Sequence, residues 1–268
     1  MRAAFAAGLA LVLAAAQPAA QGAAAEPVRL YAAGSLKAAL GEVAASFAAK
    51  AGTPVAETYG ASGLLRERIE KGEPAEIFAS ANMEHPAAVA RARGRTVAPF
   101  ATNVLCALAR PEVAATPQTL LDRMLDPMVK LGISTPKADP SGDYAWEAFA
   151  RAEALRPGAR AALERKALQL TGGPTSPQPP KDRSVYGLVF EQRQADLFLT
   201  YRTNAVVAAR EVPGLSVVDL PPALAVGATY GLTVLSDRPQ AQALAAFIRS
   251  GDGQAILARH GFGPPPQQ

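Results

Sequence analysis

Three short turns in the sequence each place a serine beside a glycine at the start of a predicted helix: Gly34-Ser35, Ser62-Gly63 and Ser141-Gly142. A helix N-terminus carries unpaired backbone N–H groups and about half a unit of positive charge. Small residues let an anion approach those groups, and each serine hydroxyl adds a donor. Several such turns directed into one cleft would bind an oxyanion without a full counter-charge. Serine also caps helices in general, so each turn taken alone is equally consistent with a structural role.

Other chemistries have little support in the sequence. His85 and His260 are the only histidines, which excludes a histidine-rich metal site, and both are predicted to lie on the surface. An enzyme on the same fold with Ser35 or Ser62 as nucleophile would need a histidine or lysine base, and none stands at a recognisable spacing. Residues 60–64 also break the serine-hydrolase pattern Gly-x-Ser-x-Gly, and the glycine loops of nucleotide sites do not occur. We therefore predict no catalytic residue, no cofactor and no directly bound metal.

Each turn follows a predicted strand and precedes a predicted helix. After the first turn, apolar residues recur on one helix face at Leu36, Leu40, Val43 and Phe47. The predicted strands are residues 28–31, 54–59, 76–80, 103–109, 130–135, 167–171, 197–201 and 230–235. The helices predicted between them make alternating units, which favour parallel sheets with helices on both faces. Ligands gather at the carboxyl ends of such strands, where all three turns lie.

The repeated units predict two α/β lobes joined by two crossing segments, near Ala101–Asn103 and near Leu232–Leu235. Residues 26–102 would form the first part of lobe 1, residues 103–233 would form lobe 2, and residues 234–268 would return to lobe 1. The cleft between such lobes is the expected ligand site. Residues 172–180 are rich in proline and glycine and are predicted to form a surface loop.

The first 25 residues have the order of a secretory signal peptide. Met1-Arg2 is followed by the uncharged apolar run Ala3–Ala16 and by small residues up to Ala25. The run is too short to span a membrane. Export predicts an oxidising compartment, yet Cys106 is the only cysteine, so it is predicted to be buried rather than disulfide-bonded. The net charge of +4 comes with scattered Lys and Arg residues, which does not support a nucleic-acid partner.

Several stretches carry a further, joint signal: Tyr31–Leu36, Tyr59–Leu65, Ile69–Ala75, Phe78–Asn82, Phe100–Leu105, Tyr230–Leu235, Gly253–Ile256 and His260–Phe262. In this order, and over nearly the whole mature chain, they resemble the periplasmic molybdate-binding proteins of ABC transporters. The resemblance implies the two-lobed type II periplasmic binding protein fold, α/β in class. Each lobe would be a mainly parallel sheet flanked by helices, with the ligand in the interlobe cleft. The resemblance also implies a monomeric, non-enzymatic protein of the periplasm that delivers its ligand to a membrane permease.

By this resemblance, Ser35 and Ser62 donate to the anion from the first lobe, and the Ser141 backbone and the Tyr201 hydroxyl donate from the second. Tyr201 could instead be a core aromatic at a strand end. A further backbone donor of the family falls near Arg183, whose guanidinium could bind the anion directly or reject the family's ligand geometry. An arginine solvated after the proline-rich loop is an equally consistent interpretation.

The predicted ligand is molybdate or tungstate, in which a metal is bound only as its oxyanion. These ions and sulfate carry no proton at neutral pH and suit neutral donors. Phosphate usually carries a proton and needs an acceptor, and Asp139 and Asp143 lie close enough to Ser141 to keep that ion open. The same fold could instead bind sulfate, phosphate or a metal chelate. A further alternative is an organic acid whose carboxylate pairs with Arg183 and Arg202.

Overall fold

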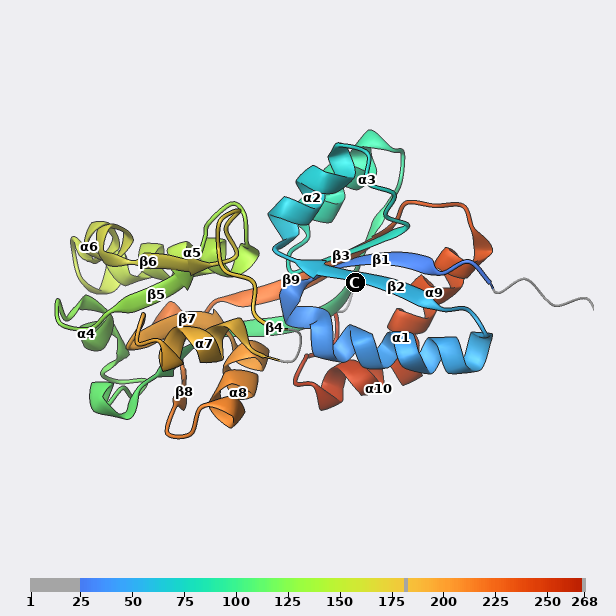
Figure 1. Ribbon diagram of the computed structural model, residues 1–268. Helices are drawn as coiled ribbons and strands as arrows, with labels where there is room; N and C mark the ends of the chain where they lie inside the picture. The colour runs from blue at the N-terminus through green and yellow to red at the C-terminus, as the bar shows by residue number, and fades with distance from the viewer. Residues whose placement is uncertain (1–24, 181–182, 267–268) are drawn as a thin grey trace, which may run out of the picture.

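The computed structural model describes residues 25–180 and 183–266, so the predicted signal peptide lies outside the described residues except for Ala25. Two α/β lobes lie side by side, and two long strands run between them (Figure 1). The strand order is β2-β1-β3-β9-β4-β7-β5-β6, and β8 also pairs with β4. No helix of the described part of the chain is long and apolar enough to cross a membrane.

The first lobe is a sheet covered by helices on both faces. Its strands are β1 (Val28–Ala33), β2 (Val55–Gly60), β3 (Ile77–Ser80), β9 (Gly227–Val234) and the first part of β4 (Val97–Ala109). Its helices are α1 (Lys37–Ala51), α2 (Ser62–Glu70), α3 (Glu84–Ala92), α9 (Pro239–Arg249) and α10 (Gly251–Arg259). Side chains alternate along β1, so Leu30 and Ala32 pack with α1, α9 and α10, while Tyr31 packs with α2 and α3. Figure 1 shows these two helix layers on opposite sides of the sheet.

The second lobe repeats this arrangement. Its strands are the second part of β4 with β5 (Leu131–Ser134), β6 (Leu168–Thr171), β7 (Leu197–Tyr201) and β8 (Ser216–Asp219). Its helices are α4 (Leu120–Leu125), α5 (Pro140–Leu155), α6 (Ala159–Lys166), α7 (Val185–Glu191) and α8 (Arg202–Glu211). Short 3-10 helices occur at η1 (Gly34–Leu36), η2 (Pro111–Val113) and η3 (Pro222–Leu224). Along β7, Leu197 and Leu199 face α4, α5 and α6, and Phe198 faces α7 and α8.

The predicted alternation of strands and helices is confirmed, and every predicted strand has a counterpart. The structure adds β8, α3, α6 and α8, which the sequence analysis did not predict. The pairs β1–β2, β1–β3, β5–β6 and β5–β7 are parallel, as expected of alternating units. The antiparallel pairs all involve β4 or β9, the strands that run between the lobes.

Strand β4 makes the first crossing. Residues Val97–Val104 pair with β9, and residues Leu105–Ala109 pair with β7 and β8. The crossing therefore lies beside Asn103, at the end of the predicted segment. The strand begins six residues before the predicted residue 103, because its first part is paired to β9 in the first lobe.

The second crossing differs from the predicted one at Leu232–Leu235. Leu232 pairs with Ala79 of β3, well inside the first lobe. The chain passes between the lobes near Val226, whose carbonyl accepts a hydrogen bond of 3.0 Å from Leu105 N. Residues 227–233 therefore belong to the first sheet and not to lobe 2. The apolar pattern marks only the buried part of β9, whereas pairing with β4 sets its full length.

Two residues test the predicted core. Cys106 is fully buried, as predicted, and burial raises the pKa of its thiol to about 12. His85 is only 7% exposed, so its predicted surface position is wrong. It lies in the first turn of α3, a helix that the sequence analysis missed and that packs against β9. Burial lowers the pKa of its imidazole and favours the neutral form.

Candidate functional site

The predicted donors lie at the carboxyl ends of strands where the two lobes meet. Ser35 follows β1 within η1, and Ser62 begins α2 directly after β2. Ser141 lies in the first turn of α5 after β5, and Tyr201 ends β7. After β1 and β2 a small residue, Ala33 or Gly60, ends the strand and lets the chain turn sharply onto the sheet face.

Three of these donors lie in two hydrogen-bonded groups that meet where the Tyr201 and Tyr230 rings contact each other. The Ser35 hydroxyl lies 3.0 Å from the Tyr230 hydroxyl, and Ser62 Oγ accepts a hydrogen bond of 3.2 Å from Ala81 N. The Tyr201 hydroxyl donates across the lobe boundary to Ala81 O at 3.3 Å. The Tyr201 and Tyr230 rings are 5.6 Å apart between centroids. Tyr201 is thus buried, but its polar end is directed at the first lobe.

The two lobes touch backbone to backbone beside these donors. Gly63 N donates to Ala138 O at 2.8 Å. A Cβ atom at Gly63 would lie 2.5 Å from Lys137 O and 2.7 Å from Ala138 O, so only glycine allows this approach. The contact brings the start of α2 against the segment that leads into α5. It therefore places Ser62 and Ser141 on either side of the lobe boundary.

Ser141 is the donor with the most unusual environment. The residue is 1% exposed, and its Oγ has no hydrogen-bond partner among the described residues. Its backbone N–H donates to Asp139 Oδ1 at 3.0 Å. A buried hydroxyl without a partner costs about 1–3 kcal/mol, so its placement needs a reason. The Ser141 hydroxyl could donate to an acceptor atom that enters at the lobe boundary.

Asp139 is a site residue that the sequence analysis considered only for phosphate. It caps α5, where an aspartate before Pro140 is a common helix start. Burial raises the pKa of its carboxyl group to about 6, and the charge of Asp143 adds to this effect. The Ser141 N–H and the Ser134 hydroxyl oppose the shift. A carboxyl group therefore stands beside the predicted anion donors.

Tyr230 and Asn103 are further polar residues of the site that the sequence analysis did not select. Asn103 Nδ2 donates to Thr203 Oγ1 at 2.9 Å and to the Tyr230 hydroxyl at 3.3 Å. Asn103 lies where β4 crosses between the lobes, so it joins Tyr230 of the first lobe to Thr203 of the second. Burial raises the pKa of both Tyr201 and Tyr230, which keeps their hydroxyl groups neutral.

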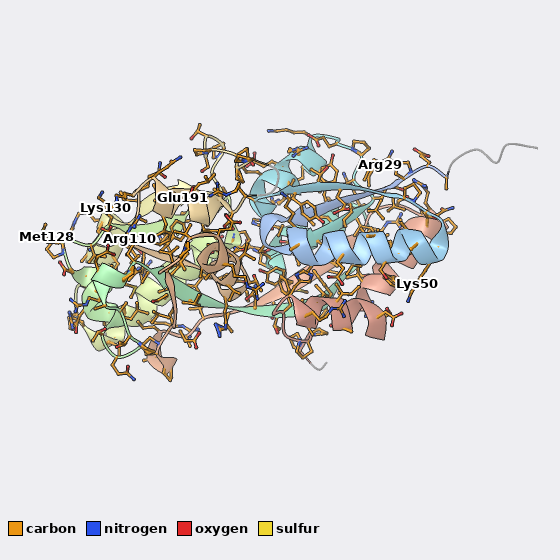
Figure 2. The ribbon with its side chains drawn as sticks, turned by 60° about the horizontal axis from the view of Figure 1, so that its bottom comes forward. Arg29, Lys50, Arg110, Met128, Lys130 and Glu191 are labelled. Atoms are coloured by element: carbon orange, nitrogen blue, oxygen red, sulfur yellow. The ribbon has the colours of Figure 1, made fainter. Side chains whose placement is uncertain are left out.

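Arg183 is engaged elsewhere on the second lobe. Its guanidinium pairs with Glu191 at 2.7 Å and with Glu211 at 3.3 Å. Figure 2 shows Glu191 on the second lobe, the lobe of Arg110 and Met128. Glu211 ends α8, whereas Tyr201 directly precedes the start of that helix, which spans about 14 Å. The structure thus joins Arg183 to an ion-pair network and does not bring it together with the other four predicted site residues.

The backbone donor expected near Arg183 is also engaged. Arg183 N donates to Pro180 O at 3.0 Å, and Ser184 N donates to Glu211 Oε1 at 2.9 Å. The carboxylate of Glu211 therefore occupies the start of α7, the position where the resemblance implied a ligand contact.

Substituting Arg183 with alanine is expected to change oxyanion affinity by less than about threefold, because two carboxylates already neutralise the guanidinium. Stability should change little, as is usual for exposed ion pairs. Calorimetric titration of the variant with molybdate measures the first quantity and urea unfolding the second. A loss of affinity of tenfold or more would place the guanidinium on the anion.

The described residues hold no group of three or more His, Cys, Asp or Glu side chains placed to bind a metal ion. The arrangement that they do contain is a set of neutral donors from both lobes with one carboxyl group beside them. Hydrogen bonding to an anion is the chemistry that this set of donors can supply.

Comparisons with known proteins identify the family of the chain. The family model described as bacterial extracellular solute-binding protein matches residues 28–263. The uncharacterized protein PM1146 of Pasteurella multocida is 38% identical over 180 residues, which cover 66% of this chain and 74% of that protein.

Two solved structures share the fold at low identity. The periplasmic molybdate-binding protein of Azotobacter vinelandii has a TM-score of 0.70 and 18% identity, over 89% of this chain and 100% of that chain. The sulfate-binding protein SubI of Mycobacterium tuberculosis H37Rv has a TM-score of 0.70 and 21% identity, over 89% of this chain and 86% of that chain. The type II periplasmic binding protein fold predicted from the sequence is thus confirmed. With the family match over nearly all of the described residues, the chain belongs to the bacterial extracellular solute-binding proteins.

Proposed function

We propose that the chain is the periplasmic solute-binding component of an ABC uptake transporter and captures a tetrahedral oxyanion, molybdate or tungstate. The observation that carries the proposal is the meeting of neutral donors from both lobes around Ser141, whose buried Oγ lacks a partner in the described structure. Two structural neighbours, a molybdate-binding protein and a sulfate-binding protein, support an oxyanion as the class of ligand.

In the proposed mechanism the anion replaces bonds that the site residues now make with one another. Ser35 would exchange the Tyr230 hydroxyl for an anion oxygen, and Tyr201 would exchange the Ala81 carbonyl. Hydrogen bonds to a charged acceptor contribute about 1.5–3 kcal/mol each. Because the donors come from both lobes, the anion stabilises the closed arrangement in which Gly63 meets Ala138. The closed form would dock on the permease, so binding shifts a population between two states.

Thermal unfolding of the mature, ligand-free protein tests this proposal directly. At 1,000 times its dissociation constant, a ligand stabilises the fold by about 4 kcal/mol, which raises Tm by on the order of 10 °C for a chain of this size. We expect such a shift with molybdate and tungstate at pH 6, and a smaller one with sulfate. Phosphate and citrate are the comparison ligands. Absence of a shift with every inorganic oxyanion at millimolar concentration, together with a shift for citrate, would instead indicate an organic acid.

A further inference from the structure

The carboxyl group of Asp139 lies beside the predicted anion donors, and unlike them it can carry a negative charge. We infer that Asp139 takes up a proton when a dianion binds, so that its carboxyl O–H becomes one of the donors to the oxyanion. This inference rests on the proposed function and extends it from the class of ligand to the proton balance of binding.

The carboxyl group of Asp139 lies next to the position that an anion bound to Ser141 would occupy. Asp139 Oδ1 accepts the hydrogen bond from Ser141 N, the same N–H that an anion would use. On the other side, a Cβ at Gly172 would collide with the Asp139 carboxylate, so the segment after β6 packs directly against it. Ser141 Oγ is buried in the same helix turn without a partner among the described residues. An anion bound at these donors therefore contacts the carboxyl group as well.

Among the described residues, the groups that shift the pKa of the Asp139 carboxyl include no positive charge. From its own helix it faces the Ser141 N–H and the acidic Asp143, and from β5 it faces the Ser134 hydroxyl. Burial is the main cause that raises the pKa of Tyr186 on α7, Tyr201 at the end of β7 and Tyr230 on β9, and the negative charge of Asp139 adds to it. All three are neutral hydroxyls. An ionised Asp139 and a bound dianion would therefore repel each other across a poorly solvated contact.

Protonation removes this repulsion. With a pKa of about 6 in the ligand-free protein, Asp139 is neutral below pH 6 and ionised at pH 8. A dianion raises the pKa further, because the neutral carboxyl donates to an anion oxygen and the carboxylate cannot. Affinity is therefore at its full value below pH 6 and falls as the pH rises above it. The expected slope is about tenfold in Kd for each pH unit above pH 7, with about one proton taken up per anion.

The variant Asp139→Asn tests the inference with little change in shape. Asparagine caps a helix as well as aspartate does, and its amide N–H₂ donates as the protonated acid would. Molybdate and sulfate are titrated between pH 5.5 and pH 8.5 by calorimetry. The unmodified protein should lose about thirtyfold in affinity between pH 7 and pH 8.5, while the variant should change by less than threefold and bind more tightly at pH 8.5. Titration of the unmodified protein at pH 8 in two buffers of different ionisation enthalpy should report about one proton per anion.

Asp143→Asn is the matched control, because Asp143 lies one turn further along α5 and accepts from Lys137 N at 2.7 Å rather than from Ser141. This variant should keep the pH dependence. A constant Kd across the range in the unmodified protein, an equal slope in Asp139→Asn, or loss of the slope in Asp143→Asn would each overturn the inference while leaving the proposed function intact. Failure of both anions to bind either protein at pH 5.5 would remove the proposed function and the inference with it.

Discussion

Replacing Ser35 and Ser62 together with alanine is expected to weaken molybdate binding at least a hundredfold. Each hydroxyl would make a hydrogen bond to a charged acceptor, worth about 1.5–3 kcal/mol, so the pair accounts for about 3–6 kcal/mol. Ser35 is hydrogen-bonded to Tyr230, and Ser62 is joined to Tyr201 through the backbone of Ala81. Calorimetric titration at pH 5.5 measures the change under conditions where Asp139 is mostly neutral.

Some loss of stability accompanies this double substitution. Without the Ser62 hydroxyl, Ala81 N loses its acceptor, which should cost about 1–2 kcal/mol, so the Tm of the variant is measured first. Ser250→Ala is the matched control, since Ser250 caps α10 through Gly253 N in the first lobe. This control should lose similar stability and keep its affinity within about twofold. An unchanged affinity in the double variant would remove the two turns from the site.

The second large effect is expected from Gly63→Ala, which should weaken oxyanion binding by more than a hundredfold. Its Cβ would lie 2.5 Å from Lys137 O and 2.7 Å from Ala138 O, and both are backbone atoms of the opposite lobe. The lobes must then stay apart by several tenths of an ångström or more, which breaks the bond from Gly63 N to Ala138 O. Donors on the two lobes can no longer reach one anion together. Affinity and the radius of gyration with saturating molybdate measure the two effects.

The folding of each lobe should survive this substitution. Gly63 is a helical residue of α2, and alanine favours a helix by about 1 kcal/mol over glycine. Gly41→Ala is the matched control, because Gly41 lies in α1 and a Cβ there would meet only Glu57 Oε2, at an ordinary 3.6 Å. The control should bind normally. Normal affinity and full compaction in Gly63→Ala would show that the anion does not require the contact between Gly63 and Ala138.

Local patterns predicted a large part of the fold and of the site. The apolar period of α1 was visible because helix packing needs one continuous face, and Leu40, Val43 and Phe47 are all buried there. The turns at Ser35, Ser62 and Ser141 were recognisable because a chain that leaves a parallel strand for a helix needs small, polar residues at that point. Four of the five predicted site residues meet at the lobe boundary.

Residues in the middle of strands gave no such signal. Tyr230 and Asn103 occupy positions where any strand residue could stand, and only the register of β4 against β9 brings them to the site. The second crossing was misplaced for a related reason. Strand length depends on the partner strand, and the sequence of β9 does not show how much of β4 it will pair with.

The sequence by itself determined the alternation of strands and helices, the two-lobed α/β class and the three serine turns, since each depends on residues close together in the chain. The tertiary structure decided which polar groups share one environment. Arg183 forms ion pairs with Glu191 and Glu211 in the folded chain, and the carboxyl group of Asp139 lies beside the donor Ser141. Charge pairing and burial depend on residues far apart in sequence, so no local pattern could have separated an engaged arginine from a ligand-binding one.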